Sequence, residues 1–158
     1  MKLFDRKKRK VFPSVAEQDA VIAYLKQCSE TDLVARFKAD KEFRYMADSV
    51  FSCWRIRNQC RTIRAARGYT QEQLAERAKV SYATINRLEN IYAPMEMSVG
   101  TLIKIAHALD VAFICRFQSW GEAIRDIIDT MAGKISLNIP AFKDDPAFQE
   151  GQTNDPNH

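Results

Sequence analysis

Apolar residues recur at every third or fourth position over most of the chain, which is the spacing of amphipathic helices. The first two predicted helices, before residue 40, open at Ser14 and Ser29, each followed three residues later by an acidic side chain, as in a capping box. The next helical pattern runs from Lys41 to a stop at Gly68, either as one long helix or as two with a break near residues 48–49.

Further helices are predicted after Gly68. Each begins behind a hydroxyl residue that can accept hydrogen bonds from the free N–H groups of the first turn: Thr70, Ser81, Ser98 and Ser119. The last helix, residues 120–131, carries an apolar stripe too wide for solvent exposure, so it must pack on the protein's own core or on a partner subunit. Residues 111–117 and 135–139 are predicted strands, because β-branched and aromatic side chains favour sheets. The polar residues 143–158 are predicted to be mostly unstructured.

Composition places the chain among ordinary globular proteins. It has 158 residues, 46% of them hydrophobic and 28% charged, which allows one good core or two small ones. No apolar run approaches the roughly 20 residues needed to cross a bilayer, and residues 1–10 lack the apolar region of a secretory signal. We therefore expect a cytoplasmic protein without a membrane partner.

Residues that could carry catalysis or hold a metal are sparse. The four cysteines include no Cys-x-x-Cys pair and there are only two histidines, so zinc-site spacing is absent. Cys53 and Cys60 lie seven positions apart on one helix face, which indicates core packing rather than a redox pair. Paired carboxylates, a nucleophile with its base and a glycine-rich phosphate loop are also missing. We expect neither metal nor cofactor, and no enzyme activity.

Positive charge is concentrated in two segments. Residues 1–12 carry six basic side chains against one acidic one, and residues 49–90 carry eight against three. In contrast, the tail 143–158 is acidic. Two separate basic segments favour a polyanionic partner, although solvated surface charge is the simpler interpretation of either one alone.

The most informative segment is residues 61–90, RTIRAARGYTQEQLAERAKVSYATINRLEN. One helix ends at Gly68, a second begins at once, and about three residues separate the second from a third helix capped by Ser81. Such close spacing forces the second and third helices to cross steeply. Leu74 and Ile85 then face inward and the other face of the third helix is polar and exposed, so that it fits the major groove of DNA.

This segment resembles the helix-turn-helix of the Cro/CI-like (XRE-like) family of phage repressors and bacterial transcriptional regulators. The matching residues are Arg64, Gly68, Thr70, Gln71, Leu74, Ala75, Val80, Ser81, Ile85, Leu88, Glu89 and Asn90. The stretch TLIKIAHALDVAF from Thr101 is similar to the family's fourth helix and its exit. Lys79 stands where the family usually has glycine, so we expect a side-chain-bearing residue with a positive φ in the turn.

The resemblance implies a mainly α fold, a helix-turn-helix bundle of the lambda-repressor-like type. We expect the N-terminal helices to extend this bundle and a short C-terminal β/α element to dimerise it. The predicted parts are a basic arm (1–12), an N-terminal helical extension (13–48), the DNA-binding domain (49–110), a strand-helix-strand dimerisation element (111–142) and a polar tail (143–158).

The resemblance also implies roles for individual residues. Base contacts fall on Tyr82, Ala83 and Arg87, of which Arg87 can donate two hydrogen bonds to guanine. Contacts to the DNA backbone or flanking bases fall on Thr70, Gln71, Lys79, Ser81, Thr84, Asn86 and Asn90. Arg64 and Glu89 are implied to form an internal ion pair. Other interpretations remain open: Tyr82 covering apolar surface, Lys79 pointing to solvent, and the basic arm being a solvated tail instead of a phosphate or minor-groove ligand.

From these residues we expect a sequence-specific regulator that binds double-stranded DNA, as a homodimeric repressor on a palindromic operator. Dimerisation is expected because one helix-turn-helix meets only one half-site. The candidate dimer surfaces are the strand 111–117 and the apolar stripe 120–131. The alternative is an antitoxin that neutralises a toxin through residues 111–158 and represses its own operon through the same helix-turn-helix.

Overall fold

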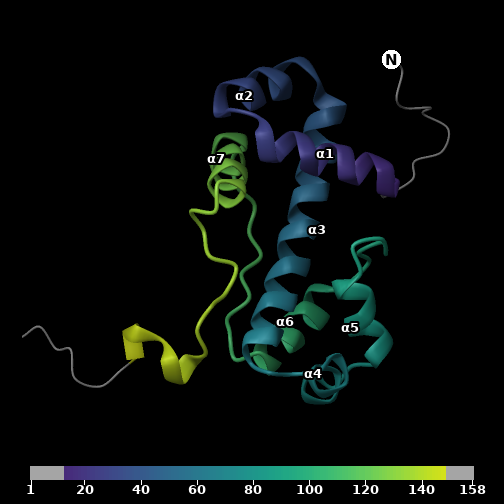
Figure 1. Cartoon of the computed structure of the whole chain (residues 1–158), viewed down its shortest axis with the longest axis vertical. Helices are drawn as coiled ribbons and strands as arrows, with labels where there is room; N and C mark the ends of the chain where they lie inside the picture. Colours follow the sequence, from purple (N-terminus) through teal and green to yellow (C-terminus); the bar gives the residue numbers. More distant parts are fainter. Residues whose placement is uncertain (1–12, 149–158) are drawn as a thin grey trace, which may run out of the picture. The chain divides into compact units, whose positions relative to one another are not determined.

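The computed structural model of the chain describes residues 13–148. The predicted basic arm lies outside the described residues, as do residues 149–158 of the predicted polar tail. All regular secondary structure of the described part is helical (Figure 1). The chain forms two compact units: the described residues up to Ile56 with Phe117–Ser136, and Arg57–Arg116 with the described residues from Leu137.

The first unit is an α-helical cluster of α1 (Val15–Gln27), α2 (Glu30–Ala39), the first part of α3 (Lys41–Ala66) and α7 (Trp120–Met131). Both expected N-terminal capping boxes are present, at Ser14 and Ser29. Helix α3 runs unbroken over 26 residues, so the single-helix alternative is confirmed. Its N-terminal half packs with the other helices around one apolar core: Val21, Leu25, Leu33, Phe37, Phe43, Ala47, Val50, Phe51, Ile124 and Ile127.

Helix α7 completes this core from far along the sequence. Ile124 and Ile127 are 6% and 1% exposed and lie among the side chains of α1, α2 and α3. Its apolar stripe therefore packs on the protein's own core. In consequence α7 groups with the predicted N-terminal extension instead of forming a separate element with residues 111–119 and 132–142.

The two predicted strands are absent from the described residues. Residues 111–117 and 135–139 form neither helix nor sheet. A strand needs a neighbouring strand to take up its N–H and C=O groups, and the described chain supplies none. Ile114 and Phe117 are 79% and fully exposed, so these apolar side chains find no core face either. The prediction of these two strands is therefore wrong as far as sheet formation within the described part of the chain is concerned.

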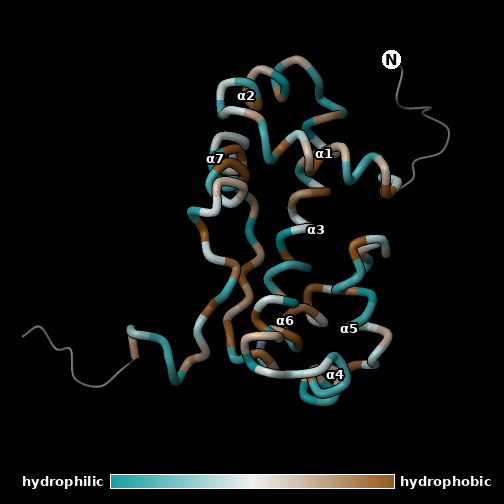
Figure 2. The backbone as a smooth tube through the Cα atoms, in the orientation of Figure 1, coloured by the Kyte–Doolittle hydropathy of each residue, from teal (hydrophilic) through white to brown (hydrophobic). Residues whose placement is uncertain are grey.

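The second unit is a small bundle of the last turns of α3 with α4 (Gln71–Ala78), α5 (Tyr82–Glu89) and α6 (Val99–Ala108). Hydrophobic and hydrophilic positions alternate along these helical tubes, as amphipathic helices require (Figure 2). The largest fully buried side chains of the unit are Leu74, Ile85 and Leu88. The expected caps Thr70, Ser81 and Ser98 all accept a hydrogen bond from their helix, as Ser119 does at α7.

The segment after residue 136 returns to this second unit. Arg67 donates to the backbone oxygen of Ile139 at 2.9 Å, and the Asp110 carboxylate accepts from the backbone N–H of Phe142 at 2.9 Å. Two short 3₁₀ turns follow, η1 (Phe142–Asp144) and η2 (Pro146–Phe148). The start of the predicted unstructured tail is therefore ordered in short turns. Among the described residues there is no helix with the length and apolar content that crossing a bilayer requires.

Candidate nucleic-acid interface

The turn between α4 and α5 depends on one left-handed residue. Lys79 has φ 54° and ψ 46°, and its N–H is directed at the carbonyl groups of Ala75 and Glu76. The N–H of Val80 bonds to the oxygen of Ala75 at 3.0 Å. The expectation of a positive φ at Lys79 is therefore confirmed. This conformation ends α4 abruptly and allows α5 to begin behind Ser81.

Helix α5 has one buried and one exposed face. Ile85, Leu88 and Glu89 are at most 2% exposed. Tyr82 is 47% exposed, and Ala83, Asn86 and Arg87 are also exposed. The three residues expected to contact bases thus lie with Asn86 on the solvent-exposed side of α5, where positions three and four apart are neighbours. The polar face of α5 is available to a groove of DNA.

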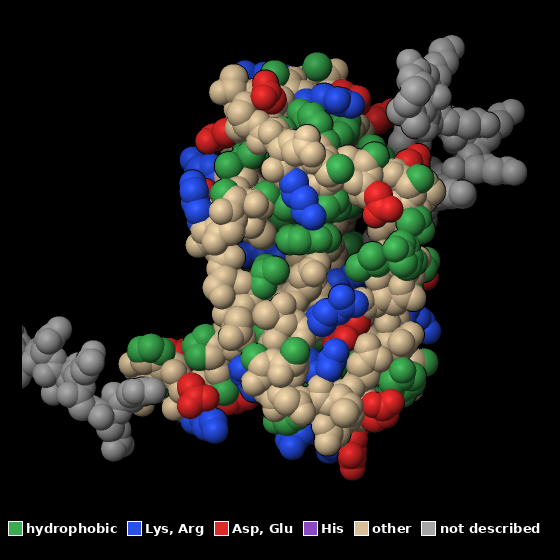
Figure 3. All heavy atoms as spheres, viewed as in Figure 1, with side chains coloured by type: hydrophobic (Ala, Val, Ile, Leu, Met, Phe, Trp, Pro, Cys, Tyr) green, Lys and Arg blue, Asp and Glu red, His purple; other side chains and the backbone are tan. Residues whose placement is uncertain are grey.

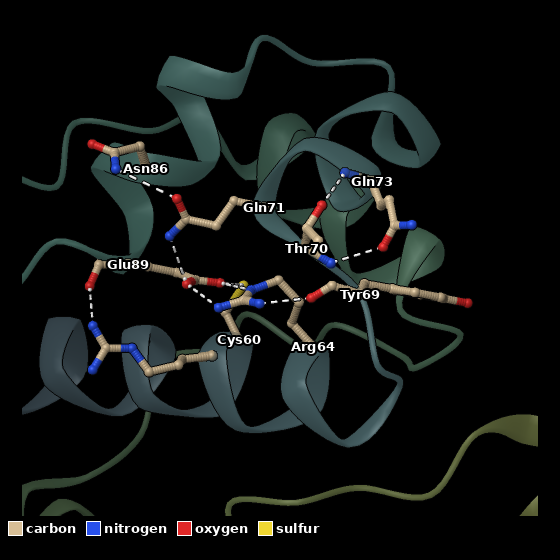
Figure 4. A network of polar contacts seen from close by, with 9 residues as sticks. Cys60, Arg64, Tyr69, Thr70, Gln71, Gln73, Asn86 and Glu89 are labelled. Atoms are coloured by element: carbon tan, nitrogen blue, oxygen red, sulfur yellow. Dashed lines mark hydrogen bonds and ion pairs between the residues drawn. The ribbon is translucent and has the colours of Figure 1, made fainter.

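Below this face, α5 is joined to α3 by an ion pair. Arg64 Nε lies 2.6 Å from Glu89 Oε1, and Arg64 donates from its NH2 group to Glu89 Oε2 at 2.8 Å (Figure 4). Its NH1 group donates to the backbone oxygen of Tyr69 at 2.7 Å. The hydrogen bond to the buried Glu89 carboxylate raises the pKa of Arg64. The structure therefore contains the ion pair that the resemblance implied.

Two amide side chains extend this network. Gln71 Nε2 donates to Glu89 Oε2 at 2.9 Å, and Asn86 Nδ2 donates to Gln71 Oε1 at 3.4 Å (Figure 4). Gln71 is the first residue of α4 and is half-buried. Its side chain, expected at a DNA phosphate, is thus already engaged with two residues of α5.

Two further arginines of α3 bind the end of α5 and the loop that follows it. Sequence reasoning did not predict this structural role. Arg61 donates to the backbone oxygen of Glu89 at 3.2 Å. Arg57 is 3% exposed and donates to the backbone oxygens of Ile91, at 2.8 Å, and Ala93. Their spacing with Arg64, at i, i+4 and i+7, marks one helix face and is the signal that could have found them.

The basic excess of residues 49–90 therefore overstates the charge available to DNA. Arg57 binds backbone oxygens and Arg64 binds the buried Glu89 carboxylate. Arg55 forms an ion pair with Asp126 at 3.1 Å. On the face shown in Figure 3, basic and acidic side chains are intermixed. The remaining charge on the α5 surface comes from Arg87, and Lys79 is exposed in the adjoining turn.

The other expected contact residues lie around the ends of α4 and α5. Thr70 and Gln73 form a capping box, with Thr70 Oγ1 accepting from the Gln73 N–H at 3.1 Å. The Ser81 hydroxyl caps α5 and lies 2.9 Å from the half-buried hydroxyl of Thr84. Asn90 is exposed, and its Oδ1 accepts from the backbone N–H of Tyr92 at 2.9 Å. These side chains are thus already engaged in hydrogen bonds that cap the two helices and hold the turn after α5.

Cys60 lies against the same network. Its Sγ is 3.9 Å from Glu89 Oε1, and burial, together with the negative charge of Glu89, raises the pKa of the thiol to about 12. The thiol is therefore neutral at physiological pH and unreactive. Within residues 13–148, the His, Cys, Asp and Glu side chains form no group of three or more able to hold a metal ion.

Comparison with known proteins agrees with this geometry. Residues 61–113 match the helix-turn-helix family model, which covers the end of α3, all of α4, α5 and α6, and the first residues beyond. No curated protein and no solved structure matches the chain. Residues 61–113 thus form a helix-turn-helix domain of the Cro/CI-like (XRE-like) type, and this domain supports a DNA-binding transcription regulator.

Proposed function

We propose that the protein is a repressor that binds a palindromic operator as a homodimer, with α5 in the major groove of each half-site. One observation carries the proposal: the face of α5 that bears Tyr82, Ala83 and Arg87 is exposed while Ile85 and Leu88 are buried. A helix held this way can enter the major groove without any rearrangement of its own domain. A repressor then acts by occupying its site in competition with polymerase.

Within this complex the exposed residues of α5 have separate tasks. The Arg87 guanidinium donates two parallel hydrogen bonds to O6 and N7 of guanine. Ala83 and the ring of Tyr82 contact thymine methyl groups. Lys79, Thr70 and the start of α4 lie toward the phosphates, where they set the register of the helix without distinguishing sequences.

A dimer is part of the proposal because useful specificity requires two half-sites, about 34 Å apart. The segment 111–117 carries the strongly exposed Ile114 and has no sheet partner among the described residues. Pairing of this segment with its copy across a two-fold axis satisfies its backbone groups and covers Ile114. Because α7 packs in the core of its own unit, it contributes less to this interface.

Selection of bound duplexes from a random DNA pool tests the proposal. The expected result is a palindrome whose half-sites lie one helical turn apart, bound by two copies of the chain as measured by light scattering. Selection of no duplex at low salt contradicts DNA recognition, and a single half-site bound by one copy contradicts the dimer. Co-purification of a small second protein that occupies residues 111–148 supports the antitoxin alternative instead.

A further inference from the structure

The side-chain amides of Gln71 and Asn86 form a chain that ends on a buried carboxylate. Glu89 is 2% exposed and receives two hydrogen bonds from Arg64 and one, at 2.9 Å, from Gln71 Nε2. Gln71 Oε1 in turn receives Asn86 Nδ2 at 3.4 Å. The chain runs from the interior of the domain to the exposed face of α5 (Figure 4).

The chemistry of the carboxylate sets the direction of both amides. Each oxygen of the Glu89 carboxylate accepts a hydrogen bond from an Arg64 N–H group, so this carboxylate acts as an acceptor toward its neighbours. Gln71 must therefore turn its NH₂ group toward Glu89, which leaves its oxygen facing Asn86. Asn86 must then turn its own NH₂ group toward that oxygen. Reversing either amide would place oxygen against oxygen or two donors against each other, which is unfavourable.

One consequence concerns the outer edge of Asn86. With Nδ2 held by Gln71, the Oδ1 atom is the end of the amide that is not engaged in this chain. Asn86 shares the exposed face of α5 with Ala83 and Arg87. The domain therefore presents a hydrogen-bond acceptor, beside the donor Arg87, on the surface that we propose enters the groove.

We propose that Asn86 is a specificity-determining residue that accepts a hydrogen bond from the exocyclic amino group of a base, and that Gln71 is the positioning residue that fixes its orientation. The inference rests on the proposed function. In the major groove, adenine and cytosine present an amino group, whereas guanine and thymine present a carbonyl oxygen at the equivalent position. Because every base pair carries one amino-bearing base, the preference is for the orientation of the pair that places adenine or cytosine, and not its thymine or guanine partner, against Asn86.

The first test uses the unaltered protein. In the duplexes it selects, one base pair is expected to lose its preferred orientation in Asn86→Ala, and the base contacted in that pair is expected to be its amino-bearing one, adenine or cytosine. Replacing that base by an analogue that lacks the amino group is expected to weaken binding about tenfold. An unchanged affinity for the analogue, or no pair whose orientation depends on Asn86, overturns the inference while leaving DNA recognition intact. Failure to select any duplex overturns both.

The second test separates positioning from folding. Gln71→Met keeps the length of the side chain but removes both hydrogen bonds, so Asn86 can turn either end outward. The ratio of affinities for the two orientations of its base pair is expected to fall about tenfold, to near one, with the preference at the Arg87 pair retained. The matched control is Gln73→Met on the same helix, which breaks the capping box of Thr70 but has no bond to α5. The control is expected to keep the ratio, and equal ratios in the two variants overturn the role of Gln71.

Discussion

Arginine shows how little a residue type says about its task in this domain. Arg64 binds a buried carboxylate, Arg57 binds backbone oxygens of the loop after α5, and Arg87 is exposed on α5. The resemblance implied the first and third of these placements. The second was not predicted, because a basic residue on a helix is charged surface unless the fold brings carbonyl groups to it.

Arg87→Ala is expected to relax sequence preference at one base pair of each half-site by about 1 to 3 kcal/mol, because the bidentate contact to guanine is lost. Competition binding with operators changed one pair at a time measures the effect. Lys104→Ala, which removes an exposed charge from α6, is the control and should leave every preference in place. A uniform loss over all sequences in Arg87→Ala would show that this side chain contacts only phosphate.

Cys60 is expected to resist alkylation in the folded protein at pH 8, because its pKa is raised from about 9 to about 12. The exposed Cys115 serves as the internal control and should react quickly. Burial of the neutral thiol contributes stability that is fully present below about pH 9 and is lost as pH rises toward 12, where only the unfolded state ionises readily. Peptide mass spectrometry after a short iodoacetamide pulse measures both sites, and equal rates would show that Cys60 is not protected.

At the scale of elements, α3 holds α5 in place. Arg57, Arg61 and Arg64 bind the last residue of α5 and the loop beyond it. Sequence reasoning predicted the helices of this region well, because caps such as Thr70 and Ser81 act within one turn and do not depend on the rest of the fold. The predicted strand 111–117 does not form among the described residues of the single chain, because a strand is defined by its neighbour and not by its own residues alone.

Arg64→Met is expected to lower the free energy of unfolding by about 3 kcal/mol, since it leaves the Glu89 carboxylate buried without its partner. The double variant Arg64→Met/Glu89→Leu should recover much of this loss, because no buried charge is left. Urea unfolding measures the series. Lys134→Met breaks the exposed pair with Asp129 and should cost less than about 1 kcal/mol. Equal losses in the two single variants would mean that the Arg64 pair is not buried in solution.

At the scale of the whole molecule, the chain builds two units from interleaved stretches. The first unit closes only when α7 brings Ile124 and Ile127 to the core of α1, α2 and α3, and the second receives the segment around Ala141. The predicted parts were consecutive stretches of sequence, with a boundary at residue 111. The two units instead combine distant stretches, because apolar faces that can bury one another group together.

Deleting residues 1–10 is expected to flatten the dependence of DNA affinity on salt, because the arm carries six basic residues and each phosphate contact contributes about 0.9 to the slope of log Kobs against log salt. Filter binding at several salt concentrations between about 50 and 200 mM measures this slope. The matched control is deletion of residues 149–158, a segment with acidic side chains but no Lys or Arg, and this deletion should not flatten the salt dependence. An identical slope with and without the arm would identify the arm as a solvated tail.

The sequence by itself determined what depends on near neighbours: the helix caps, the stop at Gly68, the left-handed Lys79 and the exposed polar flank of α5. It also carried the family resemblance, whose matching residues are spaced within about 30 positions. Only the tertiary structure decided that α7 belongs to the N-terminal core, that Arg57 is buried, and that Gln71 links Glu89 to Asn86. Such contacts join residues 15 or more positions apart, and hydrophobic burial and hydrogen-bond satisfaction select them only after the backbone has folded.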